Sequence, residues 1–186
     1  MEKSKKGTLK EPKSERPRWA SFSFLSAVES FILSPDGAEV LLLKRGSRKK
    51  VLPNYYAGVG GKMDRASVES PMDAAERETL EESGYSPKDM RDPLKLKSVF
   101  TVFDKFGRWM VFGFSGRVRK KKFLGKKTIT EGTLEWVKIT NLRKKRLILD
   151  LSNGLLEKII ASTKILFVTV TYGKNDRVIS LKTRRG

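Results

Sequence analysis

The sequence predicts an α/β (α+β) domain in which a mixed β-sheet carries helices on both of its faces. Stretches with strand character outnumber helical ones, no internal repeat is present, and only residues 70–84 and 151–162 have an amphipathic helical pattern. A large sheet needs cover on each side, so we expect these two helices on opposite faces. With 186 residues, 38% of them hydrophobic, the chain can build one core.

The expected elements follow one another with clear turn signals. Apolar runs at 26–34 and 38–46 flank a Pro-Asp-Gly turn and predict two strands, and the glycine-rich stretch 47–70 predicts a loop. The helix at 70–84 has Ser70 as its N-cap, proline at its first position and Gly84 at its end.

The second half of the chain is mainly strands. Residues 93–118 predict two strands joined at 104–108, and residues 132–139 predict a further short strand. After the helix at 151–162, residues 165–182 predict a hairpin that turns at 173–176. We expect residues 1–20 to be a flexible basic tail and residues 21–186 to form a single domain.

Composition excludes several kinds of chemistry. The chain has neither cysteine nor histidine, which excludes disulfides, thiolate metal sites and histidine-activated nucleophiles. The remaining oxygen ligands favour Mg²⁺, Mn²⁺ or Ca²⁺. No apolar run reaches the ~18 residues of a membrane span, and the N-terminus lacks the apolar core of a secretory signal, so we expect a cytoplasmic protein without a membrane partner.

The charge of the chain is strongly positive, yet carboxylates gather in residues 74–85. Lys and Arg number 40 against 21 Asp and Glu, a formal net charge of +19 that attracts polyanions. Glu78, Glu81 and Glu82 have the i, i+3, i+4 spacing of one helix face. A solvated face is the plain alternative, but no Lys is interleaved at i+4, and the helix follows a glycine-rich loop that can cradle phosphates. Carboxylates that converge require a divalent cation or a proton.

This segment resembles the signature of Nudix hydrolases, G-x5-E-x7-R-E-U-x-E-E-x-G-U, where U is a bulky apolar residue. The positions that match are Glu69, Arg77, Glu78, Glu81, Glu82, Gly84 and Tyr85. Two positions depart from the pattern: seven residues rather than five separate Gly61 from Glu69, and Thr79 stands where the family prefers an aliphatic residue.

The resemblance covers roughly residues 26–182 and is to the MutT-type branch, which includes an oxidised-purine nucleoside triphosphatase. It implies a Nudix α/β/α sandwich over 21–186 and Mg²⁺- or Mn²⁺-dependent cleavage of a nucleoside triphosphate to monophosphate and pyrophosphate, with oxidised (8-oxo-guanine type) nucleotides as candidate substrates. Alternatives with the same chemistry are dinucleoside polyphosphates, ADP-ribose, nucleotide sugars and capped RNA. An alternative of another class is an RNA-binding module with the Nudix fold.

The resemblance also implies roles for individual residues. Glu78 and Glu82 are expected as metal ligands, Glu81 as a ligand or the general base, and Glu131, five residues before Trp136, as a further ligand. The remaining expected roles are a backbone oxygen of Gly61 or Gly60 on the metal and an ion pair between Glu69 and Arg77 that fixes the loop against the helix.

The residues that would contact the phosphates and the base of the substrate are less closely defined by the sequence. Lys62 and Gly60 are expected near the phosphates. Asp150 either reads a purine edge or caps a helix, and Tyr55 and Tyr56 either stack on a base or pack in the core. Ala57 replaces an Asn that is common in this branch, which weakens the expectation of oxidised-guanine specificity.

Three basic clusters remain, at 44–50, 117–127 and 143–146. A solvated surface, a field that steers nucleoside triphosphates and an RNA contact all remain open. The largest cluster holds one aromatic residue, Phe123, which favours electrostatic attraction without base stacking.

Overall fold

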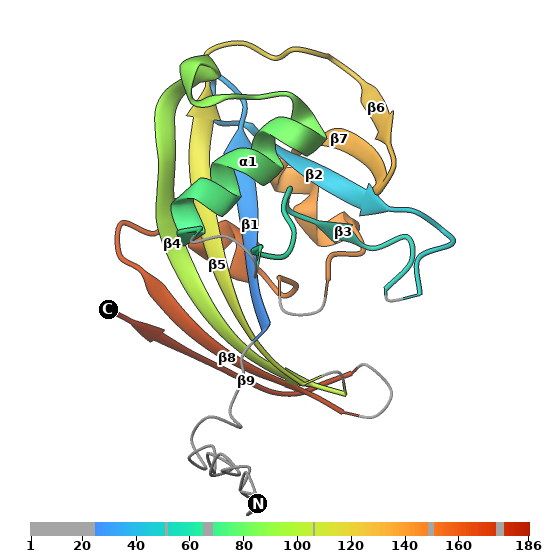
Figure 1. Cartoon of the computed structure of the whole chain (residues 1–186), viewed down its shortest axis with the longest axis vertical. Helices are drawn as coiled ribbons and strands as arrows, with labels where there is room; N and C mark the ends of the chain where they lie inside the picture. The colour runs from blue at the N-terminus through green and yellow to red at the C-terminus, as the bar shows by residue number, and fades with distance from the viewer. Residues whose placement is uncertain (1–24, 51, 65–68, 106, 149–150, 174–176) are drawn as a thin grey trace, which may run out of the picture.

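The computed structural model describes residues 25–50, 52–64, 69–105, 107–148, 151–173 and 177–186. The tail expected over 1–20 therefore lies outside the described residues. Most of the described chain forms one mixed sheet with α1 (Pro71–Ser83) against it (Figure 1). The strands are β1 (Leu25–Leu33), β2 (Glu39–Arg45), β3 (Tyr56–Ala57), β4 (Met90–Asp104), β5 (Gly107–Val118), β6 (Lys126–Ile129), β7 (Gly132–Lys138), β8 (Leu166–Tyr172) and β9 (Val178–Arg185).

The order of strands across the sheet is β6-β7-β2-β1-β5-β4-β8-β9, and β3 pairs with β2. β1 runs parallel to β5, with Val28 opposite Phe112, and β4 runs parallel to β8, with Val102 opposite Val170. The remaining pairings are antiparallel. The expected mixed sheet is confirmed.

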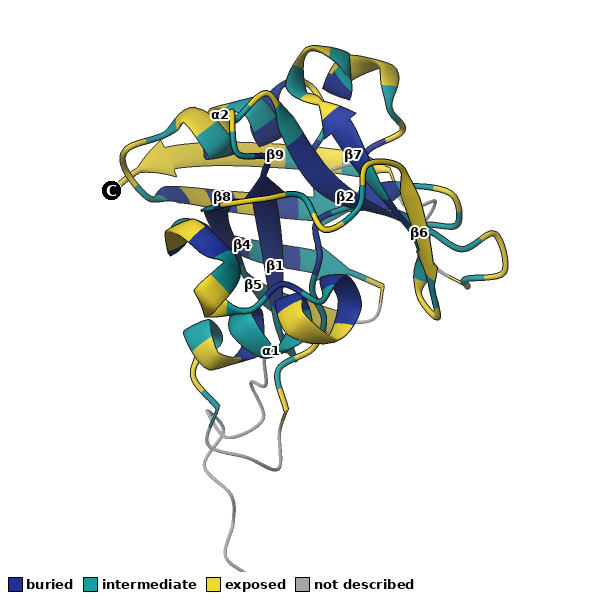
Figure 2. Ribbon diagram, turned by 90° about the horizontal axis from the view of Figure 1, so that it is seen from above, coloured by how far each residue is buried: buried dark blue, intermediate teal, exposed yellow. Residues whose placement is uncertain are grey.

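Alternating side chains divide the apolar residues between the two faces. On β1, Phe31 and Leu33 join one core cluster, whereas Val28 and Ile32 join the other. The first cluster lies under α2 (Leu155–Ala161) and the second under α1, so the helices cover opposite faces (Figure 2). This confirms the arrangement expected from the sequence.

Helix α1 begins and ends where its sequence predicts. The Ser70 hydroxyl accepts a hydrogen bond from the Asp73 amide at 3.2 Å, and the Asp73 carboxylate accepts one from the Ser70 amide at 3.1 Å. At the other end Gly84 has a left-handed backbone, with φ of 79°, and its amide donates to Leu80. These caps fix the axial position of every carboxylate on the helix.

Several elements differ from the sequence prediction. β6 falls in a basic cluster whose side chains are largely exposed, so no apolar alternation marks it as a strand. Short 3₁₀ helices at Pro87–Asp89 and Ile139–Lys144 were also not expected. Helix α2 starts at Leu155 rather than near 151, because Asn153 and Gly154 have positive φ. Among the described residues, no helix is long and apolar enough to cross a membrane.

Candidate active site at the start of β1 and on helix α1

The glycine loop runs alongside β1 and requires glycine because the two backbones approach closely. The Ser30 amide donates to the Val59 carbonyl at 2.7 Å, and the Val28 amide donates to the Gly61 carbonyl at 2.9 Å. A Cβ on Gly60 would lie 2.1 Å from the Val28 carbonyl oxygen. The glycines thus let the loop lie against the sheet directly beside α1.

A glutamate inside β1 also holds this loop, and the sequence analysis did not identify it. Glu29 is buried, and its Oε1 accepts a 2.6 Å hydrogen bond from the Gly58 amide. A Cβ on Gly58 would lie 2.5 Å from Glu29 Cγ. An acidic residue in a largely apolar strand was the available signal, since a carboxylate is rarely buried without a partner.

Glu82 is the buried carboxylate of α1. Its side chain faces the glycine loop, and Oε2 accepts a 3.0 Å hydrogen bond from the Gly60 amide. Burial raises the pKa of Glu82 to about 7, the Gly60 amide opposes that rise, and the negative charges of Glu78 and Glu131 add to it. Burial is therefore the main effect that opposes ionisation of Glu82, and the neighbouring carboxylates add to it.

Glu78 lies against the same loop, one helical turn earlier. A Cβ on Gly61 would lie 2.6 Å from Glu78 Oε1, so the absence of a side chain on Gly61 makes room for this carboxylate. The two additional residues before Glu69 do not move Gly61 away from the helix. The structure thus brings together the loop and the two helix carboxylates that the sequence associates.

Arg77 connects the other acidic residues of the segment. Its guanidinium lies 2.7 Å from Glu69, 2.7 Å from Glu78 and 3.3 Å from Glu81, and Nη2 donates to the Lys62 carbonyl at 3.4 Å. Hydrogen bonding from Arg77 lowers the pKa of Glu69, and the carboxylates raise the pKa of Arg77. The expected pair of Glu69 with Arg77 is present and is part of a larger network.

Glu131 lies on the exposed side of this group. It forms an ion pair with Lys49 from the loop after β2, and the charges of both residues act on Glu82. Glu131 therefore lies near enough to Glu82 to act on its charge, and its role as a metal ligand stays a prediction.

The expected convergence of Glu78, Glu81 and Glu82 on one point is not what the structure shows. Among the described residues, no three Asp or Glu side chains are arranged as a metal-binding group. Glu82 is buried and faces the loop, Glu81 is 58% exposed, and Arg77 holds both Glu78 and Glu81. The Arg77 guanidinium supplies the positive charge that was expected from a divalent metal ion.

The chemistry of this group still fits a divalent cation. Its donors are carboxylate and backbone oxygens, the class that Mg²⁺ and Mn²⁺ prefer. The raised pKa of Glu82 results from burial and neighbouring negative charge, and both effects favour replacement of a proton by a metal ion.

Lys62, whose carbonyl accepts from Arg77, lies beside an aromatic residue that was not expected at the site. Its backbone pairs with Ala27 of β1, and its Nζ lies 5.6 Å from the centre of the Trp109 ring. Trp109 is half-buried at the start of β5, and its Nε1 donates to Asp104 at 3.3 Å. A tryptophan next to a Gly-Arg turn was the only signal in the sequence.

Tyr56 lies in the core, the packing alternative that the sequence left open. Its ring is 8% exposed, its hydroxyl donates to Glu135 at 3.0 Å, and Lys145 lies 4.8 Å from the ring centre. Burial raises the pKa of Tyr56. The neighbouring Tyr55 carries Arg146 at 4.2 Å over its ring. Asp150, expected at the base, lies outside the described residues.

The basic cluster at 117–127 is partly neutralised by acidic partners. Lys121 pairs with Glu39, Lys122 lies 2.9 Å from Asp89, and Arg117 lies 3.3 Å from Asp92. Several of its charges therefore join elements within the fold.

Comparisons with known proteins agree with this architecture. The family model of the NUDIX domain matches residues 23–155. A MutT protein from Bacillus halodurans superposes with a TM-score of 0.68 at 23% identity, covering 86% of this chain and 97% of that one. The NUDIX domain of Shewanella oneidensis NrtR, solved with ADP ribose, gives 0.59 at 15% identity, with coverages of 78% and 90%. The C. elegans Ap4A hydrolase gives 0.55 at 20% identity, with coverages of 75% and 98%.

These structural matches share the fold, and the family model spans the glycine loop, the α1 carboxylates and Trp109 in one match. The chain therefore belongs to the Nudix family of hydrolases.

Proposed function

We propose that this hydrolase cleaves the diphosphate linkage of nucleoside triphosphates, giving a monophosphate and pyrophosphate, with Mg²⁺ or Mn²⁺ as cofactor. The observation that supports this most directly is the position of Glu82, which is buried, bonded to the glycine loop and has a pKa raised to about 7. A buried carboxylate with excess negative charge around it is suited to hold a metal ion and, through it, phosphate oxygens.

Different residues would hold the metal ion and accept the proton. Glu82 and Glu78, with a backbone oxygen of Gly60 or Gly61, would hold the cation, and Glu131 would add a carboxylate once it leaves Lys49. The cation would polarise a phosphoryl oxygen and lower the pKa of the attacking water. Glu81, an exposed carboxylate of the helix, is suited to accept the proton from that water.

Lys62 and Trp109 define the direction of the substrate. The Lys62 ammonium would neutralise phosphate charge, and the half-buried ring of Trp109 would offer an apolar surface for the base. A nucleotide that extends from the α1 carboxylates past Lys62 to Trp109 would place its phosphates at the acidic end.

Glu82→Gln tests the site, with Glu76→Gln as a matched control on the same helix. We expect Glu82→Gln to remove metal-dependent release of pyrophosphate by a factor of about 1000 or more, and Glu76→Gln to leave it within about twofold. Retention of full turnover by Glu82→Gln, with a folded protein by circular dichroism, would contradict the assignment.

A second candidate substrate class has some support from the structural neighbours. One is solved with ADP ribose and another is an Ap4A hydrolase, so ADP-ribose and dinucleoside tetraphosphate belong in the assay beside dATP, dGTP and 8-oxo-dGTP. Pyrophosphate as the product identifies triphosphate hydrolysis. AMP with ribose 5-phosphate from ADP-ribose, or two nucleoside phosphates from the dinucleoside tetraphosphate, identify the alternative.

A further inference from the structure

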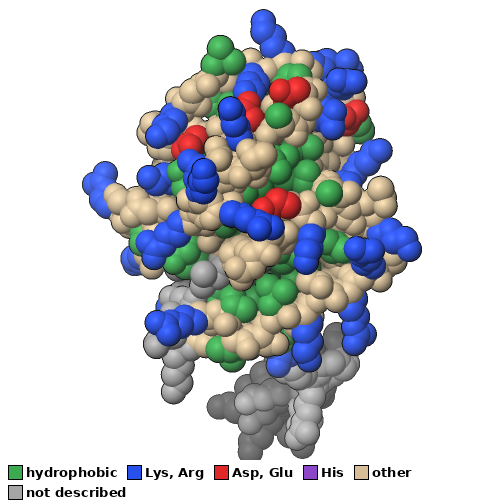
Figure 3. Space-filling view, turned by 180° about the vertical axis from the view of Figure 1, so that it is seen from behind, with side chains coloured by type: hydrophobic (Ala, Val, Ile, Leu, Met, Phe, Trp, Pro, Cys, Tyr) green, Lys and Arg blue, Asp and Glu red, His purple; other side chains and the backbone are tan. Residues whose placement is uncertain are grey.

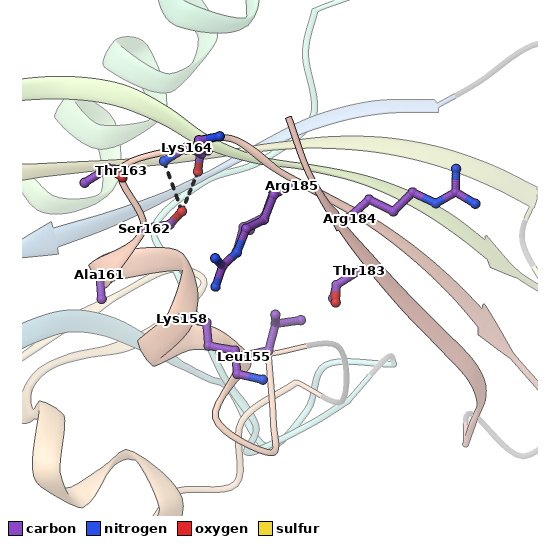
Figure 4. Close-up of a pocket in the computed structure, with 10 residues that line it drawn as sticks. Leu155, Lys158, Ala161, Ser162, Thr163, Lys164, Thr183, Arg184 and Arg185 are labelled. Carbon is purple, nitrogen blue, oxygen red and sulfur yellow. Dashed lines mark hydrogen bonds between the residues drawn. The ribbon is translucent and has the colours of Figure 1, made fainter.

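A cavity lies away from α1, between helix α2 and the hairpin of β8 and β9 (Figure 4). Its volume is about 550 Å³, and four of its lining residues are cations: Lys158, Lys164, Arg184 and Arg185. None of the described residues that line it is Asp or Glu. The cavity therefore has a positive charge that no acidic wall balances.

Two of these cations face each other across the cavity. Figure 4 shows Arg185 extending from β9 toward α2, where Lys158 lies, whereas Arg184 points away from them. Neither Lys158 nor Arg185 forms an ion pair with a described carboxylate, and Glu157 on α2 is placed 3.8 Å from Arg143 instead. Like charges on opposite walls repel, and an anion bound between them would relieve that repulsion.

A second cavity extends the first along the same face of β9. Its volume is about 430 Å³, it shares Lys158 and Thr183 with the first, and it adds Arg177 at the far end of the strand. We call the two together the α2–β9 groove, defined by Lys158, Arg177, Thr183 and Arg185. From 177 to 185 a strand spans about 26 Å, which suits a chain of phosphates better than a single phosphate.

Charges on β9 also protect the exposed edge of a sheet, and this is the competing explanation. β9 is the last strand in the sheet, and Lys and Arg on an edge strand hinder pairing with other chains. Lys182 and Arg184, which alternate with Thr183 and Arg185, meet that need from the other face. Edge protection does not explain Lys158 on α2 opposite Arg185.

The view of the α2 face shows the setting of this groove: Lys and Arg side chains project from much of the surface, and few acidic ones are visible (Figure 3). No aromatic residue is among the described lining of either cavity, so the groove offers no surface on which bases could stack. Its chemistry recognises phosphates and not bases.

We propose that the α2–β9 groove binds the sugar–phosphate backbone of a single-stranded nucleic acid without selecting its sequence. β9 lies four strands from β1 in the sheet, about 19 Å at the usual strand spacing, and α1 covers the face opposite to the groove. Binding in the groove therefore does not depend on the hydrolytic activity proposed above, and Glu82→Gln leaves it unchanged.

The experiment measures fluorescence anisotropy of labelled single-stranded RNA of about 12 nucleotides, with EDTA present to prevent hydrolysis. The test variant is Lys158→Ala with Arg185→Ala. The control is Lys182→Ala with Arg119→Ala, which removes the same charge from exposed residues outside the lining of both cavities. Thermal unfolding of both variants verifies that each is folded.

We expect the test variant to lose about tenfold in affinity and the control less than about threefold. Removing two phosphate contacts, at about 0.7 each for a single strand, lowers the slope of log K against log salt by about 1.4. Oligouridine and oligoadenosine of equal length should bind the wild type alike.

Equal losses of RNA affinity in the two variants would overturn the proposed binding site. They would leave only the general attraction of a basic protein for RNA. Unchanged binding in the test variant would overturn it as well. Inorganic tripolyphosphate is used as a competitor to distinguish a site for a nucleic acid backbone from a site for a short polyphosphate anion. Competition by tripolyphosphate at the same molar concentration as the RNA would overturn the assignment to a nucleic acid backbone.

Discussion

Arg77 binds Glu69 through two parallel contacts, with Nε 2.7 Å from Oε1 and Nη2 3.2 Å from Oε2. Glu69 precedes the helix and in turn accepts the Asp64 amide at 3.0 Å, so this pair ties the end of the glycine loop to α1. The same guanidinium holds Glu78 and Glu81 through Nη1. One side chain thus positions the loop and two of the proposed reacting carboxylates.

The network predicts that Arg77→Lys is not a conservative change. A lysine ammonium cannot keep the two-point contact with Glu69 while it holds Glu78, so we expect kcat to fall about 10- to 100-fold. We expect a smaller effect on stability, because the lysine ammonium can keep one contact with Glu69. Steady-state kinetics and thermal unfolding measure the two effects. Arg91→Lys, on an exposed position of β4, should change neither.

Glu82 should make the metal-free protein less stable as pH rises. Its pKa is about 7 in the folded state against 4.5 for the ordinary carboxyl, so the protonated form is favoured by folding. The resulting loss of stability begins above pH 4.5 and is complete above about pH 7.

Glu82→Gln removes that ionisation, and we expect it to stabilise the metal-free protein at pH 8 by about 2 kcal/mol, with little effect near pH 4. Chemical denaturation in EDTA at the two pH values measures this. Added Mg²⁺ should raise the stability of the wild type and not of the variant. A variant less stable than the wild type at pH 8 in EDTA would contradict this electrostatic account.

Much of this fold was predictable from the sequence because its signals are local. The caps of α1 depend on Ser70, Asp73 and Gly84, which lie within or next to the helix, and the turn glycines mark the first hairpin. β6 was not predictable, because its exposed polar residues become a strand only through pairing with β7.

The candidate site divides in the same way. Helical spacing is enough to associate Glu78 with Glu82. It does not reveal the ion pair of Arg77 with Glu78 or that of Lys49 with Glu131. Lys62 lies beside Trp109, and Lys158 lies across a cavity from Arg185. The members of each pair are far apart in the chain, and only the folded sheet brings them near each other.

Gly61 should be intolerant of a methyl group because of Glu78. The added Cβ would lie 2.6 Å from Oε1 of the carboxylate, so either Glu78 or the loop must shift. We expect Gly61→Ala to reduce kcat by about 100-fold, since small displacements of reacting groups are costly. Gly125→Ala is the control, because nothing lies within 4 Å of a Cβ there. Equal activity of the two variants would contradict the close approach.

Replacement of Thr79, which departs from the family pattern, should increase the stability of the folded protein. Its side chain is buried, and its hydroxyl has no hydrogen-bond partner in the described structure. Thr79→Val keeps the shape and removes the unsatisfied group, so we expect a gain of about 1 kcal/mol and a Tm higher by about 2–4 °C. Thr79→Ser, which keeps the hydroxyl and loses a methyl, should be less stable than the wild type. Calorimetry compares the three.

Trp109 should contribute to nucleotide binding more than to chemistry. Its ring packs against the core cluster on the α2 face, whereas α1 covers the other face, so we expect it to contact the base and not the scissile linkage. We expect Trp109→Ala to raise KM by about tenfold or more with a smaller change in kcat, and Trp109→Phe to retain most of the affinity, since stacking on an aromatic ring is worth about 1–3 kcal/mol. Equal KM values for the Ala and Phe variants would show that the base lies elsewhere and that the ring serves only to pack the start of β5.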